Sequence, residues 1–200
     1  MLRTMNAALA AAVVIALAGC GTKGGWMGAE AEKKYDKELE ASRLASINNN
    51  DDYYEFHRGG VIYVISDKKD LKNFIQFDEI PKTVTKIGGG PKGERVVFSL
   101  TSTEAKAMEG KVGFQGGAQR MYEGAVAGLD KGFMGMVSKG GKVAVFDNWN
   151  ALVAYRKSGK TPAGGASVKG AGPKDETVTF YGNAEELKTR FADAVSIPKK

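Results

Sequence analysis

The chain has 200 residues, of which 29 are Lys or Arg and 23 are Asp or Glu, so its formal net charge is +6. The charges are interspersed, and the longest basic runs are pairs such as Lys33 and Lys34. A nucleic-acid-binding protein would cluster its basic residues, so we expect no nucleic-acid partner. A hydrophobic content of 42% is too high for a disordered tail and indicates a folded body.

The first nineteen residues have the pattern of a secretory signal peptide. Arg3 is their one charged residue, a run of small and apolar residues extends from Ala7 to Ala18, and Gly19 closes the segment. This run is shorter than the roughly twenty residues that a membrane-spanning helix needs. We therefore expect residues 1–19 to be cleaved off, which leaves 28 basic and 23 acidic residues, a net charge of +5.

Leu17, Ala18, Gly19 and Cys20 resemble the lipobox of bacterial lipoproteins at all four positions. The resemblance implies that Cys20 carries a diacylglyceryl group and becomes the first residue of the mature protein. The alternative is an ordinary signal peptide whose cleavage site precedes a cysteine. Gly21 follows the cysteine where an aspartate would retain the protein in the inner membrane, so the same resemblance implies the outer membrane, facing the periplasm.

Cysteine usage agrees with a lipid anchor. Cys20 is the only cysteine of the chain, so no internal disulfide and no paired-cysteine zinc site can form. Each buried methylene of an acyl chain contributes about 0.8 kcal/mol, so two or three chains attach a protein durably to a bilayer. We therefore expect the membrane to be a partner through the lipid on Cys20, with residues 20–52 forming a flexible tether and helical stalk.

The body of the chain contains two stretches that match each other. Residues 58–67 align with 139–148 at an offset of 81, and residues 91–98 align with 173–180 at an offset of 82, with five of eight residues identical. Hairpin turns draw on few residue types, so the glycine pairs alone would prove little. The shared order of turns, apolar positions and proline predicts an internal duplication. The two repeats are expected over residues 53–112 and 133–200.

Each repeat has the pattern ββαββα. Two segments rich in aromatic and β-branched residues flank a Gly-Gly pair, which is typical of a hairpin, and a helix-capping residue follows. Two further strands and a second capped helix complete the unit. The strands are expected at 53–58, 61–66, 83–87, 95–100, 133–139, 142–146, 166–168 and 177–181, and the helices after Asp67, Thr101, Asp147 or Asn148, and Asn183. This predicts an α+β fold with antiparallel sheets and helices on one side.

A glycine-rich joint is expected to connect the repeats at residues 113–132. Within it, apolar residues recur at helical spacing from Ala118 to Leu129. We therefore expect a bridging helix between the two repeats.

Met134 and Met136 are candidate metal ligands. They lie two residues apart on an expected strand, so their thioethers share a face, and thioethers select Cu(I). His57 or Met121 could complete the site. Residues 134–155 are similar to part of the NosL-type copper lipoproteins, a resemblance that implies a copper carrier, although the Cys-Gly-Met motif of that family is absent outside the lipobox. Alternatively, strand methionines are ordinary core residues.

Aromatic residues offer a second candidate site. Tyr53, Tyr54 and Trp149 could form a surface that binds a ligand or glycan, and Trp149 corresponds to Lys68 in the other repeat. Trp26 lies in the expected tether. The alternative is that these side chains pack in the core.

The sequence holds little that indicates catalysis. His57 is the only histidine, no serine has the context of a nucleophile elbow, and the glycine-rich segment 88–94 precedes a strand and lacks a Walker pattern. We expect no enzymatic activity and no cofactor. The predicted function is that of a lipid-anchored cell-envelope protein that binds an envelope protein or glycan. The alternative is a periplasmic small-ligand or Cu(I) carrier that uses Met134, Met136 and His57.

Overall fold

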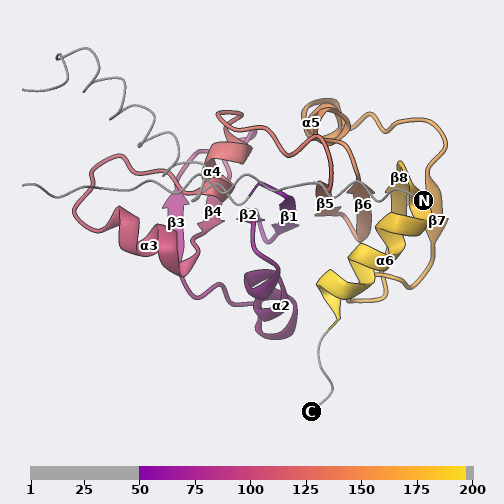
Figure 1. Ribbon diagram of the computed structural model, residues 1–200, viewed down its shortest axis with the longest axis horizontal. Helices are drawn as coiled ribbons and strands as arrows, with labels where there is room; N and C mark the ends of the chain where they lie inside the picture. Colours follow the sequence, from indigo (N-terminus) through magenta and orange to yellow (C-terminus); the bar gives the residue numbers. More distant parts are fainter. Residues whose placement is uncertain (1–49, 197–200) are drawn as a thin grey trace, which may run out of the picture. The chain divides into compact units, whose positions relative to one another are not determined.

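The structure is a computed structural model that describes residues 50–196 (Figure 1). The expected signal peptide, Cys20, Trp26 and nearly all of the expected stalk lie outside the described residues. The described residues belong to one compact unit. Within residues 50–196, no helix is long and apolar enough to cross a membrane.

Eight strands of the described residues form one sheet, in the order β3-β4-β2-β1-β5-β6-β8-β7. The strands are β1 (Asp52–Arg58), β2 (Val61–Ile65), β3 (Thr83–Lys86), β4 (Arg95–Ser99), β5 (Met134–Lys139), β6 (Lys142–Phe146), β7 (Ala166–Val168) and β8 (Thr177–Tyr181). The helices are α2 (Lys68–Phe77), α3 (Ser102–Met108), α4 (Gly117–Tyr122), α5 (Trp149–Ser158) and α6 (Ala184–Val195). The α+β class is confirmed, and both halves of the sheet have the element order ββαββα. The duplication itself stays a prediction.

The sheet is mixed, which differs from the antiparallel sheets expected for each repeat. The hairpins β1–β2 and β5–β6 and the outer pairs β3–β4 and β7–β8 are antiparallel, whereas β2–β4, β6–β8 and the central pair β1–β5 are parallel. The β1–β5 pair covers the free edge that each half would otherwise expose. Joining the halves at this edge turns two sheets into one.

The helices cover both faces of the sheet, which corrects the expectation that they lie on one side. In Figure 1, α4 and α5 lie above the strands, whereas α2 and α6 lie below them. The two hydrophobic cores follow this division: Leu71 of α2 belongs to one and Leu152 of α5 to the other. Strands β1 and β5 are parallel neighbours. A rotation of 180° that superposes one on the other keeps the strand direction, so its axis runs along the strands. Such a rotation exchanges the two faces of the sheet. The corresponding helices α2 and α5 therefore pack on opposite faces.

Local signals account for the element boundaries. Gly59 and Gly60 adopt φ of 56° and 73°, which a two-residue hairpin turn requires. The Asp67 side chain caps α2 by accepting from the backbone N–H of Lys69 at 2.9 Å, as predicted. Thr101 and Glu104 form the predicted capping box of α3. These capping predictions are confirmed.

The second half has the same kind of caps. Asn148, and not Asp147, caps α5, because its side chain accepts from the N–H of Ala151 at 3.1 Å. The Asp147 carboxylate instead accepts from the N–H of Asn183 at 2.7 Å. Asn183 in turn caps α6.

The expected bridging helix is shorter than predicted. The apolar spacing extends from Ala118 to Leu129, but α4 ends at Tyr122. Gly124 adopts φ of 79°, and the N–H of Ala125 returns to the carbonyl of Arg120 at 2.8 Å. A left-handed glycine directly after the last turn is a common helix stop. The segment after α4 is therefore a loop.

Candidate functional site

The structure does not bring together the three residues of the predicted copper site. Met134 and Met136 are fully buried on β5, in the core that α2 and α6 cover. His57 and Tyr53 are alternate residues of β1, so their side chains project from the same face of the strand. That face is opposite to the one of Met134 and Met136, because Tyr53 belongs to the other core. Met121 also lies in that opposite core. Among residues 50–196, no group of three or more His, Cys, Asp or Glu side chains is placed to hold a metal ion.

The structure also does not present the predicted aromatic surface. Tyr53 and Tyr54 are 0% exposed, and successive strand residues place them in opposite cores. Trp149 is half-buried and packs edge-on against Tyr53 and Phe133, with centroid distances of 5.8 and 5.6 Å. These side chains serve packing, which was the alternative interpretation.

A cavity of about 470 Å³ lies on the side of the sheet that carries α4 and α5. Its wall is formed by β1, β2, β5, the loop between β3 and β4, Tyr122 at the end of α4, and the last turn of α5. The lining includes Glu55, His57, Ile62, Gly89, Gly90, Pro91, Tyr122, Val137, Lys139, Tyr155, Arg156 and Lys157.

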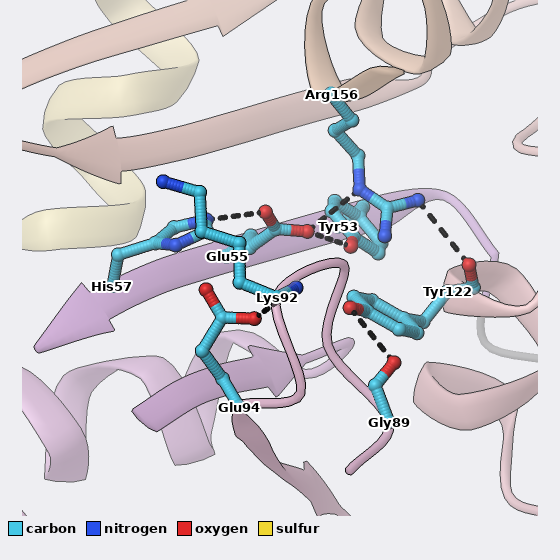
Figure 2. Close-up of polar contacts among 8 residues, drawn as sticks. All are labelled: Tyr53, Glu55, His57, Gly89, Lys92, Glu94, Tyr122 and Arg156. Atoms are coloured by element: carbon cyan, nitrogen blue, oxygen red, sulfur yellow. Dashed lines mark hydrogen bonds and ion pairs between the residues drawn. The ribbon is translucent and has the colours of Figure 1, made fainter. Parts of the chain in front are cut away.

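Glu55 of β1 is the centre of the polar groups at this wall (Figure 2). Its Oε1 lies 2.7 Å from Nε2 of His57. Its Oε2 accepts from the hydroxyl of Tyr53 at 2.5 Å and from Nε of Arg156 at 2.6 Å. Tyr53, Glu55 and His57 are alternate residues of one strand, so their side chains project to the same face. Both carboxylate oxygens are thus occupied by groups of the protein.

Arg156 connects three elements that are far apart in the sequence. Its Nε binds Glu55 of β1, and its terminal NH1 donates to the carbonyl of Tyr122 at the end of α4, at 3.3 Å. The guanidinium carbon lies 4.3 Å from the ring centroid of Tyr122 and 5.2 Å from that of Tyr53. Such cation–π contacts are stronger when they are desolvated. The Arg156 side chain is therefore held in one orientation at the cavity wall.

The environment keeps both members of the ion pair charged. Burial alone would raise the pKa of Glu55, but the hydrogen bond from His57, the charge of Arg156 and the hydrogen bond from Tyr53 hold that pKa below its ordinary value. Burial works to lower the pKa of Arg156, and its interactions with Tyr53 and Glu55 raise that pKa overall. The side chains are only 5% and 14% exposed. The site is thus a desolvated, ionised Glu55–Arg156 pair.

The glycine-rich loop between β3 and β4 forms the facing wall. It is a turn between strands, and the N–H of Gly90 donates to the carbonyl of Glu94 at 3.0 Å. A Cβ on Gly90 would come within 2.9 Å of the Cβ of Glu94, so a side chain there would force the loop to shift. The Tyr122 hydroxyl reaches the carbonyl of Gly89 at 3.5 Å and joins the loop to α4. These contacts hold the loop against the cavity.

The other two cations of the lining, Lys139 and Lys157, are available to bind a ligand. Lys139 and Lys157 are exposed, and within residues 50–196 neither has an ion-pair partner. Among residues 50–196, no Ser, Thr or Cys side chain lines the cavity. The described wall therefore offers no serine, threonine or cysteine nucleophile. Charge recognition is what this arrangement can supply.

The chain matches no known protein family, no curated protein and no solved structure. The site is therefore interpreted from its geometry. Sequence reasoning singled out His57 but missed Glu55, Tyr122 and Arg156. One signal was available: Glu55 alternates with Tyr53 on the expected strand at 53–58, so its carboxylate shares a strand face with an aromatic ring. Arg156 lies 101 residues away from Glu55, and no local pattern indicates that pairing.

Proposed function

We propose that this chain is a lipid-anchored protein of the bacterial cell envelope that binds a small molecule in the cavity beside Glu55, without catalysing a reaction. The observation that carries the proposal is the buried Glu55–Arg156 pair at the wall of a cavity of about 470 Å³. Ligand pockets are typically about 300–1,000 Å³, mostly apolar, and contain a few placed polar groups. The cavity has these properties.

The cost of burying two charges supports a role in binding. A buried ion pair is often no more stable than well-packed apolar residues of similar volume. The positions that correspond to them in the opposite halves illustrate this: at the offset of 81, Glu55 corresponds to Met136 and Arg156 to Ile75, and both of these apolar side chains are buried. The same fold thus accepts apolar residues at these positions. A charged pair that packing does not demand is best explained by a ligand.

The shape of the site favours a small molecule over the protein or glycan partner that the sequence first indicated. The functional groups converge inside a concavity, whereas a macromolecular contact would use exposed side chains. Two of the three residues of the predicted aromatic surface are buried. Small-ligand binding was the alternative prediction, and it is now the main proposal. The lipid on Cys20 and the outer-membrane location remain part of it.

The test is native mass spectrometry of the protein extracted gently from its own envelope. We expect one small-molecule adduct per chain, released when the protein is denatured. The same sample should show a polypeptide of residues 20–200 with acyl chains attached, and Cys20→Ala should lose these chains while retaining the adduct.

Two results would contradict the proposal. The first is a protein that carries no adduct and crosslinks in the envelope to one stoichiometric protein partner. This result would support the original prediction of a protein that binds another envelope protein. A chain without acyl groups and cut elsewhere would remove the anchor.

A further inference from the structure

We infer that the ligand of this cavity is an organic anion with a flat apolar body, held at its charged end by Lys139 and Lys157 together with Arg156. This inference rests on the proposed function, because it assigns the chemical class of molecule that the same cavity takes. It follows from the charges, hydrogen-bond donors and apolar groups that line the cavity.

The charge of the lining is positive. It contains three cationic side chains, Lys139, Arg156 and Lys157, against the single carboxylate of Glu55. Both oxygens of Glu55 already accept from the protein, and the Arg156 guanidinium balances its charge. Glu94 borders the loop, and its Oε2 accepts from the N–H of Lys92 at 2.7 Å. Glu55 and Glu94 thus both have partners in the protein, whereas within residues 50–196 Lys139 and Lys157 have no ion-pair partner.

Glu55 has a positioning role in this arrangement. It binds Nε of Arg156 at 2.6 Å, and the carbonyl of Tyr122 binds NH1 at 3.3 Å. The guanidinium is therefore oriented by the protein before a ligand arrives. Such preorganisation lowers the entropic cost of binding an anion. Lys139 and Lys157 add charge at the mouth, where their flexible side chains remain in solvent.

The rest of the wall is apolar and partly flat. Ile62, Pro91 and Val137 line it, together with the rings of Tyr122 and Tyr155. Tyr155 is held by Phe146, with a centroid distance of 5.4 Å, and Tyr122 is held by Phe98 at 5.5 Å. Fixed rings favour flat, apolar ligand groups. An inorganic ion would leave these surfaces unused.

The test compares two probes that differ in charge and share one body, 2-naphthoate and the neutral 2-naphthamide. Calorimetric titration uses the chain from residue 20 with Cys20→Ala, so that no detergent is needed. We expect naphthoate to bind one site about tenfold or more tightly than the amide, since a charge-assisted hydrogen bond is worth that difference. Lys139→Gln combined with Lys157→Gln should weaken naphthoate binding about tenfold and leave the amide unchanged.

The matched control is Lys111→Gln combined with Lys169→Gln, which removes the same charge from two exposed lysines outside the cavity. It should leave naphthoate binding within about twofold. Equal binding of the two probes, equal losses in the two lysine pairs, or no binding of naphthoate would overturn the inference. An adduct in native mass spectrometry would still uphold the proposed function, so the two failures are distinguishable.

Discussion

Strands β1 and β5 occupy corresponding places in the two halves of the sheet, yet one carries charge where the other carries sulfur. At the offset of 81, Glu55 corresponds to Met136 and His57 to Ser138. Glu55 is 4% exposed and Met136 is 0% exposed, so both positions are buried. The fold thus fixes burial at this position but does not fix polarity. The charge of Glu55 is therefore explained by the cavity beside it and not by the packing of the sheet.

The surroundings of the two strands differ in the same way. A second cavity of about 410 Å³ lies near Phe74, which corresponds to Tyr155 of the first cavity. Two of its three cations, Arg58 and Lys174, pair with Asp78, whose side chain is 63% exposed, and Arg95 is the third. In the first cavity the carboxylate is buried under its partners, and the lysines at the mouth are left unpaired. The two cavities therefore differ in the burial of their carboxylate, which is 5% exposed at Glu55 and 63% exposed at Asp78.

The largest effect is expected from copying one residue of the second half into the first. Glu55→Met should lower the free energy of unfolding by about 3–5 kcal/mol, because it leaves Arg156 buried without its carboxylate. Urea unfolding at neutral pH measures this. The matched control is Met136→Leu, which should cost less than about 1.5 kcal/mol. If Glu55→Met lowers the free energy of unfolding by less than about 1 kcal/mol, the Arg156 guanidinium is solvated or paired by another group in that variant.

Copying both residues should recover much of that loss. Glu55→Met combined with Arg156→Ile reproduces the corresponding residues Met136 and Ile75, which lie in the opposite core. We expect a coupling energy of about 1–3 kcal/mol between the two substitutions, so that the double variant is more stable than Glu55→Met alone. A double-mutant cycle in urea measures it. Additive losses would contradict the view that packing does not require the charges.

Asp52, on the same strand as Glu55, should give a pH dependence of the opposite sign. Burial, together with the charge of Asp51, raises the pKa of Asp52 from 3.8 to about 6. The folded protein then binds this proton more tightly than the unfolded chain, so stability rises as the pH falls from 7 to 5. The lowered pKa of Glu55 instead removes stability only when the pH falls below its ordinary value of 4.5.

Asp52→Asn should reduce the gain in stability between pH 7 and pH 5 by on the order of 1 kcal/mol. Urea unfolding at both pH values measures this. Part of the gain should remain, because the pKa of Asp70 is also raised to about 6, mainly by burial. An unchanged gain in Asp52→Asn would show that Asp52 ionises normally in the folded protein.

The smallest effect is expected at the second cavity. Lys174 lies 3.5 Å from Asp78, and the two side chains are 50% and 63% exposed. Exposed ion pairs contribute about 0–1 kcal/mol, so Lys174→Gln should change the free energy of unfolding by less than about 0.5 kcal/mol. Thermal and urea unfolding check this together. A large loss would mean that the second cavity depends on charge as the first one does.

Local chemistry made much of the fold predictable. The strand at 166–168 and the one at 177–181 were predicted with the bounds that the structure has, and the glycine-pair hairpins and most caps follow from short-range rules. The face on which each helix packs depends on the parallel β1–β5 pairing, which links residues about 80 positions apart. Sequence reasoning about each repeat separately could not determine that pairing.

The candidate site was much less predictable, for the same physical reason. His57 was notable as the only histidine, but its meaning depends on Glu55, whose second oxygen is bound by an arginine 101 residues away. Methionines 134 and 136 do lie on one strand face, as predicted, but that face is buried in the core. Local periodicity gives the face of a side chain and leaves its distant partners unknown.

The most direct test of the central claim is native mass spectrometry of the Glu55→Met, Arg156→Ile double variant beside the wild-type protein, both extracted from the envelope. We predict a folded double variant that has lost the small-molecule adduct, while Met136→Leu retains it. A folded double variant with the same adduct as the wild type would show that the Glu55–Arg156 pair has no part in binding.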